Sequence, residues 1–198
     1  MSSRSAGWHG RGVTGHPRRA SRRPGRSSRR RRRVGIGTDI LSAVTDGVVE
    51  LALVGAGRMG RMHLRALDPA AGRTAAVRVT DVVEPIPEAR EALRGSGYRV
   101  HTTLADLLAA RRPDGVLVAA PTDHHADVAR AALAAGIPVL CEKPAGLTSQ
   151  EVEETGRVAA DRGVAFQVAY WRRFVPAMVA LRERVLAGEL GQILHLVC

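Results

Sequence analysis

The sequence predicts an α/β protein built on a doubly wound parallel sheet. Short, uninterrupted apolar segments such as 116–119 and 137–141 are typical of strands that helices cover on both faces. Helical patterns alternate with these segments, as expected for right-handed strand–helix–strand crossovers. The first strand also leads directly into a glycine-rich turn at residues 55–60. These three observations together indicate one sheet with a helix after most of its strands.

The chain supplies six such strands in order, with helices between them. The strands are expected at residues 50–54, 75–80, 98–101, 116–119, 137–141 and 164–168. Helices are expected at residues 59–67, 87–93, 126–135 and 176–187. Two further helices are predicted to start at capping residues, one at Thr103 with Asp106 and one at Thr148 with Glu151, and to end before Pro113 and at Gly163.

The glycine turn Gly55-Ala56-Gly57-Arg58-Met59-Gly60 has the spacing of a dinucleotide-binding turn. In such turns the first glycine permits a tight bend, the second lets the backbone approach a pyrophosphate, and the third lets the helix pack closely on the strand. The amide groups at the helix start then face the phosphates. An ordinary strand-to-helix turn can have the same residues, so the motif needs support from the rest of the chain.

Asp81 is the predicted ribose-binding residue. It ends the expected second strand and lies 21 positions beyond Gly60, where a carboxylate can accept hydrogen bonds from the adenosine ribose hydroxyls. A carboxylate there repels a 2′-phosphate, so the sequence favours NAD over NADP. The alternative is an ordinary strand-end aspartate that starts the turn into Glu84-Pro85.

Polar residues also follow the fourth and fifth expected strands, in the segments 121–125 and 142–144. Ligands of doubly wound (Rossmann) sheets bind at the carboxyl ends of strands, so these segments and the glycine turn predict one shared site.

Lys143 is the only lysine in the chain. An ammonium can act as a point donor to a substrate hydroxyl, which a planar guanidinium does less well. The alternative is an ordinary surface lysine.

Charge and cysteine content narrow the function classes. The formal charge of +11 is concentrated in residues 1–33, which hold twelve Arg and no Asp or Glu, so the rest of the chain is near neutral. This extension is predicted to be disordered. It is either a solvated extension, including sequence upstream of the true start, or a nucleic-acid-binding tail; the preference for Arg throughout the chain speaks against the tail.

The two cysteines form no disulfide or metal pattern, and the adjacent histidines His124 and His125 have no ligand cluster around them. One of these two histidines is expected to face solvent at a helix start. No segment is long and apolar enough to predict a membrane span, and no export signal follows Arg32-Arg33. We therefore expect no metal and a reducing, cytoplasmic location.

Four stretches together resemble the Gfo/Idh/MocA oxidoreductases, over about residues 49–198. They are GAGRMG, AAPTDHH, VLCEKPAGLT and AYWRRFVP. The last stretch is most similar to inositol or sugar dehydrogenase-like members. The resemblance implies an NAD(P)-binding Rossmann domain at 49–171 and the start of a C-terminal α/β substrate domain at 172–198.

The resemblance also implies site residues. It assigns the pyrophosphate to the glycine turn and the ribose to Asp81, and it places Lys143 near both nicotinamide and substrate as the catalytic residue. Further residues beside the cofactor are Ala56, Arg58, Met59, Pro121, Thr122, His125, Glu142, Pro144 and Arg172. Arg173 shares the position of Arg172 at the domain junction.

The chain differs from the family in length. Family members are usually much longer, and their downstream Asp and His, which take part in substrate binding and proton transfer, have no counterpart here. His195 lies in an expected strand at 192–197 and has no assigned role. We expect this chain to bind NAD and to turn over a polyol or sugar poorly or not at all. The alternative is a non-catalytic NAD-binding or partner-binding module, and the resemblance raises homo-oligomerisation as a hypothesis.

Overall fold

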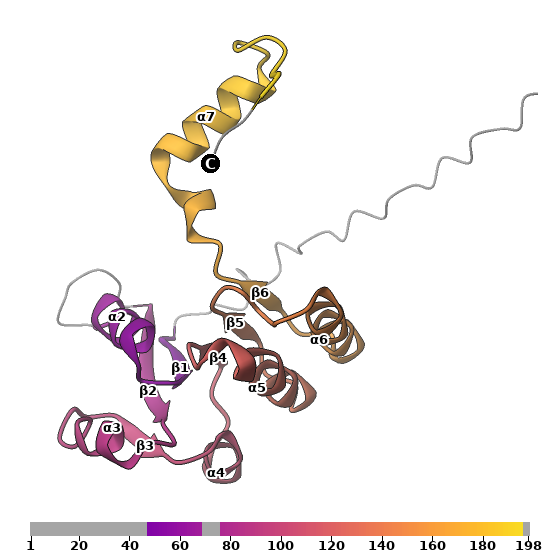
Figure 1. Ribbon diagram of the computed structural model, residues 1–198. Coiled ribbons are helices and arrows are strands. Elements are labelled where there is room, and N and C mark those ends of the chain that lie inside the picture. Colours follow the sequence, from indigo (N-terminus) through magenta and orange to yellow (C-terminus); the bar gives the residue numbers. More distant parts are fainter. Residues whose placement is uncertain (1–46, 69–75, 196–198) are drawn as a thin grey trace, which may run out of the picture. The chain divides into compact units, whose positions relative to one another are not determined.

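Six parallel strands form one sheet in the order β3-β2-β1-β4-β5-β6 (Figure 1). This computed structural model describes residues 47–68 and 76–195. The strands are β1 (Val49–Val54), β2 (Val77–Val83), β3 (Arg99–His101), β4 (Gly115–Val118), β5 (Val139–Cys141) and β6 (Phe166–Val168). The order is that of a doubly wound dinucleotide-binding sheet. The predicted fold class is therefore confirmed.

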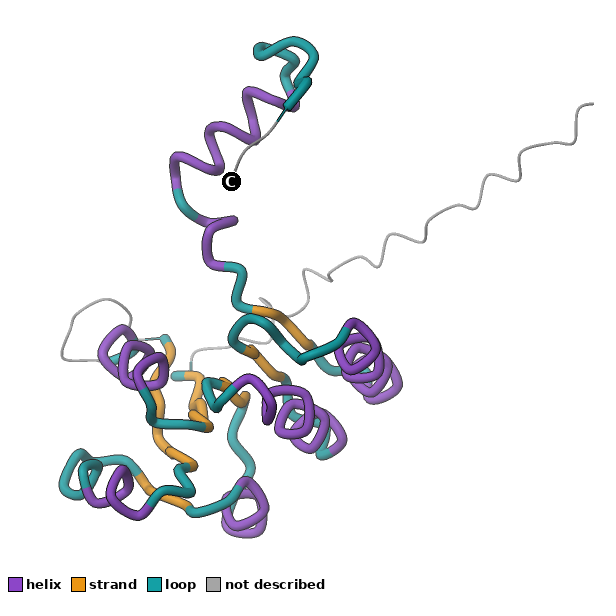
Figure 2. The backbone as a smooth tube through the Cα atoms, viewed as in Figure 1, coloured by secondary structure: helices purple, strands orange, loops and turns teal. Residues whose placement is uncertain are grey.

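Helices alternate with the strands along the chain (Figure 2). They are α2 (Arg58–Ala66), α3 (Pro87–Glu91), α4 (Leu104–Ala110), α5 (Thr122–Ala134), α6 (Ser149–Arg162) and α7 (Pro176–Leu186), with a short 3-10 helix η2 (Trp171–Phe174). The predicted caps are present: the Thr103 side chain accepts from Asp106 N–H, and Thr148 accepts from Glu151 N–H. Gly163 ends α6 with a φ of 64°.

The core lies on both faces of the sheet, because successive side chains of each central strand point to opposite sides. In β4, Val116 and Val118 belong to a cluster with α4, α5 and α6, whereas Leu117 belongs to a second cluster with α2. Figure 1 shows α2 and α3 on one side of the sheet and α4, α5 and α6 on the other. Burial on both faces explains the uninterrupted apolar runs in the sequence.

Two predicted boundaries are wrong in ways that affect the site. β2 continues through Val83 rather than ending at 80, because its last residues pair with the end of β1 as Leu53↔Val82 and Val54↔Val83. α5 starts at Thr122 rather than 126, directly after Pro121 at the N-cap. Because α5 starts at Thr122, His124 and His125 belong to its first turn.

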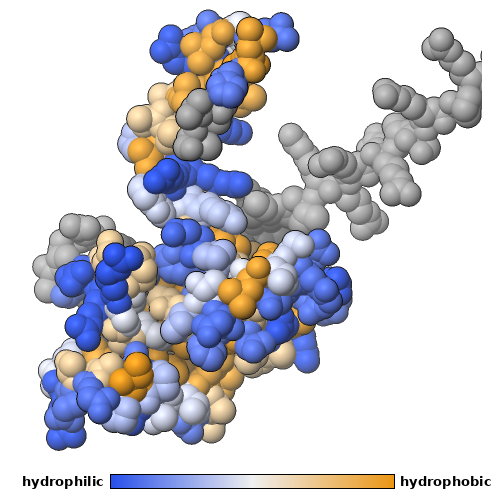
Figure 3. All heavy atoms as spheres, viewed as in Figure 1, coloured by the Kyte–Doolittle hydropathy of each residue, from blue (hydrophilic) through white to orange (hydrophobic). Residues whose placement is uncertain are grey.

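After β6 the chain leaves the sheet through η2 and α7, which expose large apolar side chains. Orange residues stand among blue ones along this part of the chain in the space-filling view (Figure 3). The exposed apolar residues of η2 and α7 are Trp171, Phe174, Met178, Leu181, Val185 and Leu186. The expected strand at 192–197 is not formed over its described residues, 192–195.

The expectations for residues 1–33 lie outside the described residues, as does the end of the chain beyond residue 195. Among the helices of the described ranges, none is long and apolar enough to cross a membrane.

We predict that Gly156→Ala stabilises the protein by about 0.5–1 kcal/mol, because glycine in a helix interior costs backbone entropy. Gly156 lies within α6, and an added Cβ would meet nothing within 4 Å. Urea-induced unfolding measures the change. Gly163→Ala is the control and should destabilise, because its positive φ disfavours a side chain. A loss of stability in Gly156→Ala would contradict the packing of α6.

Candidate functional site

A cavity of about 860 Å³ lies at the carboxyl ends of β1, β2, β4 and β5. This is the edge of the sheet at which the sequence predicts a shared site. The lining includes nine of the predicted site residues, namely Gly55, Gly57, Arg58, Met59, Pro121, Thr122, His125, Glu142 and Lys143. Ala56, Gly60, Asp81, Pro144 and Arg172 are not among the residues that line it.

The three glycines of the turn have different surroundings. Gly55 has a φ of +94°, and an added Cβ would lie 2.7 Å from the Ala119 carbonyl oxygen. At Gly60 an added Cβ would lie 2.0 Å from the Gly55 carbonyl oxygen. At Gly57 it would meet no atom within 4 Å. Gly55 and Gly60 are therefore required by the packing of the chain itself, whereas Gly57 leaves open space beside the cavity.

Helix α2 begins at this open space. Gly57 is its N-cap and provides no side-chain cap, and Gly57, Arg58 and Met59 line the cavity. The first N–H groups of an α-helix have no partner within the helix, and its dipole favours negative charge at that end. The turn therefore presents donors and positive potential to an anion, as a pyrophosphate requires.

Glu84, not Asp81, is the acidic residue at the end of β2. The residue is 4% exposed and lines the cavity. One carboxylate oxygen accepts the Ala56 N–H at 2.8 Å, and the other accepts the Ile86 N–H at 3.0 Å. Glu84 is thus held against the glycine turn. The pairing of Val82 and Val83 with β1 moves the strand end past Asp81, so local composition alone does not identify Glu84 as the residue at the strand end. The apolar pair before Glu84-Pro85 was the available signal.

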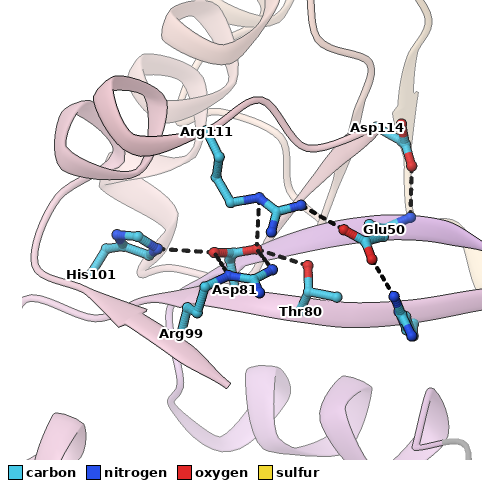
Figure 4. A network of polar contacts seen from close by, with 8 residues as sticks. Glu50, Thr80, Asp81, Arg99, His101, Arg111 and Asp114 are labelled. Atoms are coloured by element: carbon cyan, nitrogen blue, oxygen red, sulfur yellow. Dashed lines mark hydrogen bonds and ion pairs between the residues drawn. The ribbon is translucent and has the colours of Figure 1, made fainter. Parts of the chain in front are cut away.

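Asp81 instead lies inside the sheet, opposite Ala52 of β1, and is fully buried. Arg99 donates to both of its oxygens, at 3.0 and 3.1 Å, and the His101 ring nitrogen lies 3.0 Å from one of them (Figure 4). The Thr80 hydroxyl donates at 2.7 Å, and Arg111 forms an ion pair at 3.5 Å. The Asp81 side chain is enclosed by these contacts, and it does not line the cavity, whereas Glu84 does.

The network around Asp81 extends along β1. The Glu50 carboxylate accepts hydrogen bonds from both Arg111 and Arg78 (Figure 4). The backbone N–H of Glu50 donates to the Asp114 side chain at 2.8 Å. The hydrogen bond from Arg78, together with that from Arg111, lowers the pKa of Glu50. Acidic and basic side chains from distant parts of the chain thus neutralise one another near β1, β2 and β3.

Burial alone would raise the pKa of Asp81. Hydrogen bonds from Arg99, His101 and Thr80 outweigh burial and lower the pKa from 3.8 to about 2. Because the folded pKa lies below the unfolded value, the contribution to stability is present above pH 3.8 and is lost as the pH falls toward 2. This difference corresponds to about 2 kcal/mol at neutral pH.

The segment after β5 carries the lysine. Glu142 is 7% exposed; its Oε2 accepts the Lys143 N–H at 3.1 Å, and its Oε1 lies 2.9 Å from the ring nitrogen Nε2 of His63. The Lys143 side chain is exposed.

Cys141, two residues before Lys143, is fully buried. Its burial, together with the charge of Glu142, raises the pKa of its thiol to about 12. Cys141 is therefore a packed core residue rather than a nucleophile.

His125 joins the two loops that follow β4 and β5. The residue is 2% exposed. Its Nδ1 lies 2.6 Å from the Pro144 carbonyl oxygen, and its Nε2 lies 2.7 Å from the Ala120 carbonyl oxygen. Its neighbour His124 is exposed, as expected for one of the pair. No group of three potential metal ligands occurs within residues 47–68 and 76–195.

Arg172 lies beside a second cavity, of about 510 Å³, which Lys143 also lines. Its guanidinium carbon is 5.7 Å from the centre of the Trp171 ring, and that of Arg173 is 5.5 Å from the Tyr170 ring. Lys143 therefore borders both cavities, whereas Arg172 and Arg173 border only the smaller one of the two.

We predict that Asp81→Asn lowers the free energy of unfolding by about 2 kcal/mol at pH 7, because it removes the buried charge that Arg99 and Arg111 pair with. The variant should also show a smaller decline in stability than the wild type between pH 3.8 and 2, because Asp81 no longer contributes to it. Urea-induced unfolding across this range measures both effects. Asp161→Asn, an exposed change in α6, is the control and should change stability by less than about 0.5 kcal/mol. An equal pH dependence in Asp81→Asn and the wild type would contradict the network.

Comparison with known proteins finds a matching family model and relatives that are oxidoreductases or related catabolic proteins. A family model described as "Oxidoreductase family, NAD-binding Rossmann fold" matches residues 49–170. The rhizopine catabolism protein MocA of Rhizobium meliloti is 41% identical over 148 residues, which are 75% of this chain and 45% of that protein. An inositol 2-dehydrogenase of the same species is 34% identical over 73% of this chain and 43% of its own length. The chain thus spans less than half the length of these curated relatives.

Solved structures similar to this chain are also dehydrogenases. The scyllo-inositol dehydrogenase of Lactobacillus casei, with bound NAD(H) and scyllo-inositol, superposes with a TM-score of 0.67 at 26% identity, over 74% of this chain and 43% of that one. The WlbA dehydrogenase of Bordetella pertussis, in complex with NADH and UDP-GlcNAcA, gives a TM-score of 0.69 at 25% identity, over 75% and 42%. With the glycine turn, the strand order and the family match in agreement, the chain belongs to the Gfo/Idh/MocA family of oxidoreductases, in its NAD-binding Rossmann part.

Proposed function

We propose that this chain is the cofactor-binding part of an NAD-dependent oxidoreductase that transfers hydride between nicotinamide and a hydroxyl-bearing carbon of a polyol or sugar. The observation that carries the proposal is the single cavity that joins the glycine turn, Glu84 and Lys143. A volume of about 860 Å³ is within the usual range for cofactor sites. The inositol dehydrogenases among the relatives support a polyol substrate.

The residues present fit NAD. The open space at Gly57 and the start of α2 would hold the pyrophosphate, and Glu84 would accept from the adenosine ribose. Pro121, Thr122 and His125 would border the cofactor on the β4 side. When bound, NAD supplies the hydride acceptor, and the protein supplies position and electrostatics.

Lys143 is the proposed catalytic residue. It borders both the larger cavity and the smaller one beside Arg172, so it stands where cofactor and substrate would meet. Its ammonium can donate a hydrogen bond to the substrate oxygen and orient the carbon that loses hydride. Proton removal from the hydroxyl requires a base, which we propose lies in the substrate domain. We propose that residues 172–198 form the beginning of that substrate domain.

We further propose a cytoplasmic location. Cys141 is a free, buried thiol, which suits a reducing compartment. Homo-oligomerisation and the absence of nucleic-acid binding stay predictions.

Gly57→Ala tests the cofactor site directly. The added methyl group meets no protein atom within 4 Å, so the melting temperature should stay close to that of the wild type. Because the methyl group would fill the space that a pyrophosphate needs, NAD affinity should fall about tenfold or more. Isothermal titration calorimetry with NAD measures this, with Gly156→Ala as the matched control. Unchanged NAD affinity in Gly57→Ala, or no NAD binding by the wild type, would contradict the proposal.

Glu84 should determine the preference for NAD over NADP, because its carboxylate would repel a 2′-phosphate. Glu84→Gln is expected to raise the ratio of NADP affinity to NAD affinity about tenfold. Asp81→Asn is the control: it should lower stability and leave the ratio unchanged. The opposite result, a changed ratio in Asp81→Asn alone, would return the ribose-binding role to Asp81.

A further inference from the structure

One contact joins the helix after the glycine turn to the segment that carries the lysine. The Nε2 atom of His63 in α2 lies 2.9 Å from Oε1 of Glu142, which is 79 residues further along the chain. The His63 side chain is 22% exposed and the Glu142 side chain 8%. His63 has no role in the sequence motifs, and it does not line the cofactor cavity.

Glu142 has a fixed backbone and a carboxylate that needs donors. Its N–H donates to the Val118 carbonyl at 2.8 Å, which attaches this residue to the end of β4. A carboxylate this buried is costly unless hydrogen bonds satisfy it. One oxygen accepts the Lys143 N–H at 3.1 Å, and the other faces His63. His63 therefore helps to orient the Glu142 carboxylate, which in turn accepts a hydrogen bond from the Lys143 backbone N–H.

The same helix forms the end of the cavity at which the pyrophosphate would bind. Gly57, Arg58 and Met59 line the cavity, and His63 follows them one turn later in α2. A side chain on a packed helix has a defined position relative to the helix start. The contacts of Glu142 with His63 and with the Lys143 N–H therefore connect α2 to the backbone of Lys143.

We propose that His63 is a positioning residue for Lys143. By donating from Nε2 to Glu142, it holds the carboxylate so that the second oxygen fixes the Lys143 amide. The position of Lys143, which lines both cavities, then depends on the helix that begins at the glycine turn. What Lys143 does in catalysis rests on the proposed function, but the linkage itself is a property of the chain without cofactor.

The single lysine makes the linkage measurable. Protein labelled with α-¹⁵N-lysine has one backbone amide signal, that of Lys143, because the chain contains no other lysine. His63→Leu should shift this signal and raise its hydrogen-exchange rate about tenfold. His63→Gln places an amide N–H near the Nε2 position and should restore the wild-type signal, whereas His63→Asn is too short to do so.

His195→Leu is the matched control, since His195 is exposed in the described range, and it should leave the signal unchanged. A purely structural role of His63 would accelerate exchange of core amides such as Leu53 by the same factor, so these are measured in uniformly labelled protein. The proposal expects acceleration at Lys143 alone. An unchanged Lys143 signal in His63→Leu, equal acceleration in the core, or no difference between His63→Gln and His63→Asn would overturn it.

Addition of NAD to the same labelled protein separates this inference from the proposed function. A signal that responds to His63→Leu but not to NAD supports the linkage and contradicts the cofactor site. A signal that responds to NAD but not to His63→Leu overturns the linkage and leaves the cofactor site standing.

Discussion

The close approach of α2 to the end of β1 is the constraint on which the site depends. No side chain fits at Gly60, where an added Cβ would lie 2.0 Å from the Gly55 carbonyl oxygen, or at Gly55, where it would lie 2.7 Å from the Ala119 carbonyl oxygen. This contact brings the helix start to the mouth of the sheet, between β1 and β4. It positions Gly57 beside the cavity and His63 beside Glu142. Backbone packing at two glycines therefore determines the geometry of both ends of the site.

Three buried carboxylates in this sheet show how the surroundings decide the role of one chemical group. Asp81 is enclosed by arginine and histidine side chains from β3 and the residues after α4, and it contributes to stability. Glu84 is held by two backbone N–H groups and lines the cavity. Glu142 lies between a histidine and the backbone of the lysine. Each carboxylate is satisfied by a different set of donors, as burial requires, and only the last two face the cavity.

The ion-paired region around Asp81 has a cost as well as a benefit. Removing charged side chains from water is unfavourable, and such networks stabilise a fold chiefly when every partner is present. Here the arginines come from β2, β3 and the residue after α4, while the acids that pair with them, Glu50 and Asp81, come from β1 and β2. The network therefore forms only when the sheet has its native order. It therefore adds specificity for the register of β1, β2 and β3.

The sequence by itself determined the fold class, the alternation of strands and helices, the caps at Thr103 and Thr148, and the importance of the glycine turn. These features depend on local periodicity and on the conformations that glycine and capping residues permit. Only the tertiary structure decided which acidic residue stands at the end of β2, because the strand end is defined by pairing with β1 and not by local composition. The contact of His63 with Glu142 was equally hidden, since it joins residues that only the packed sheet brings together.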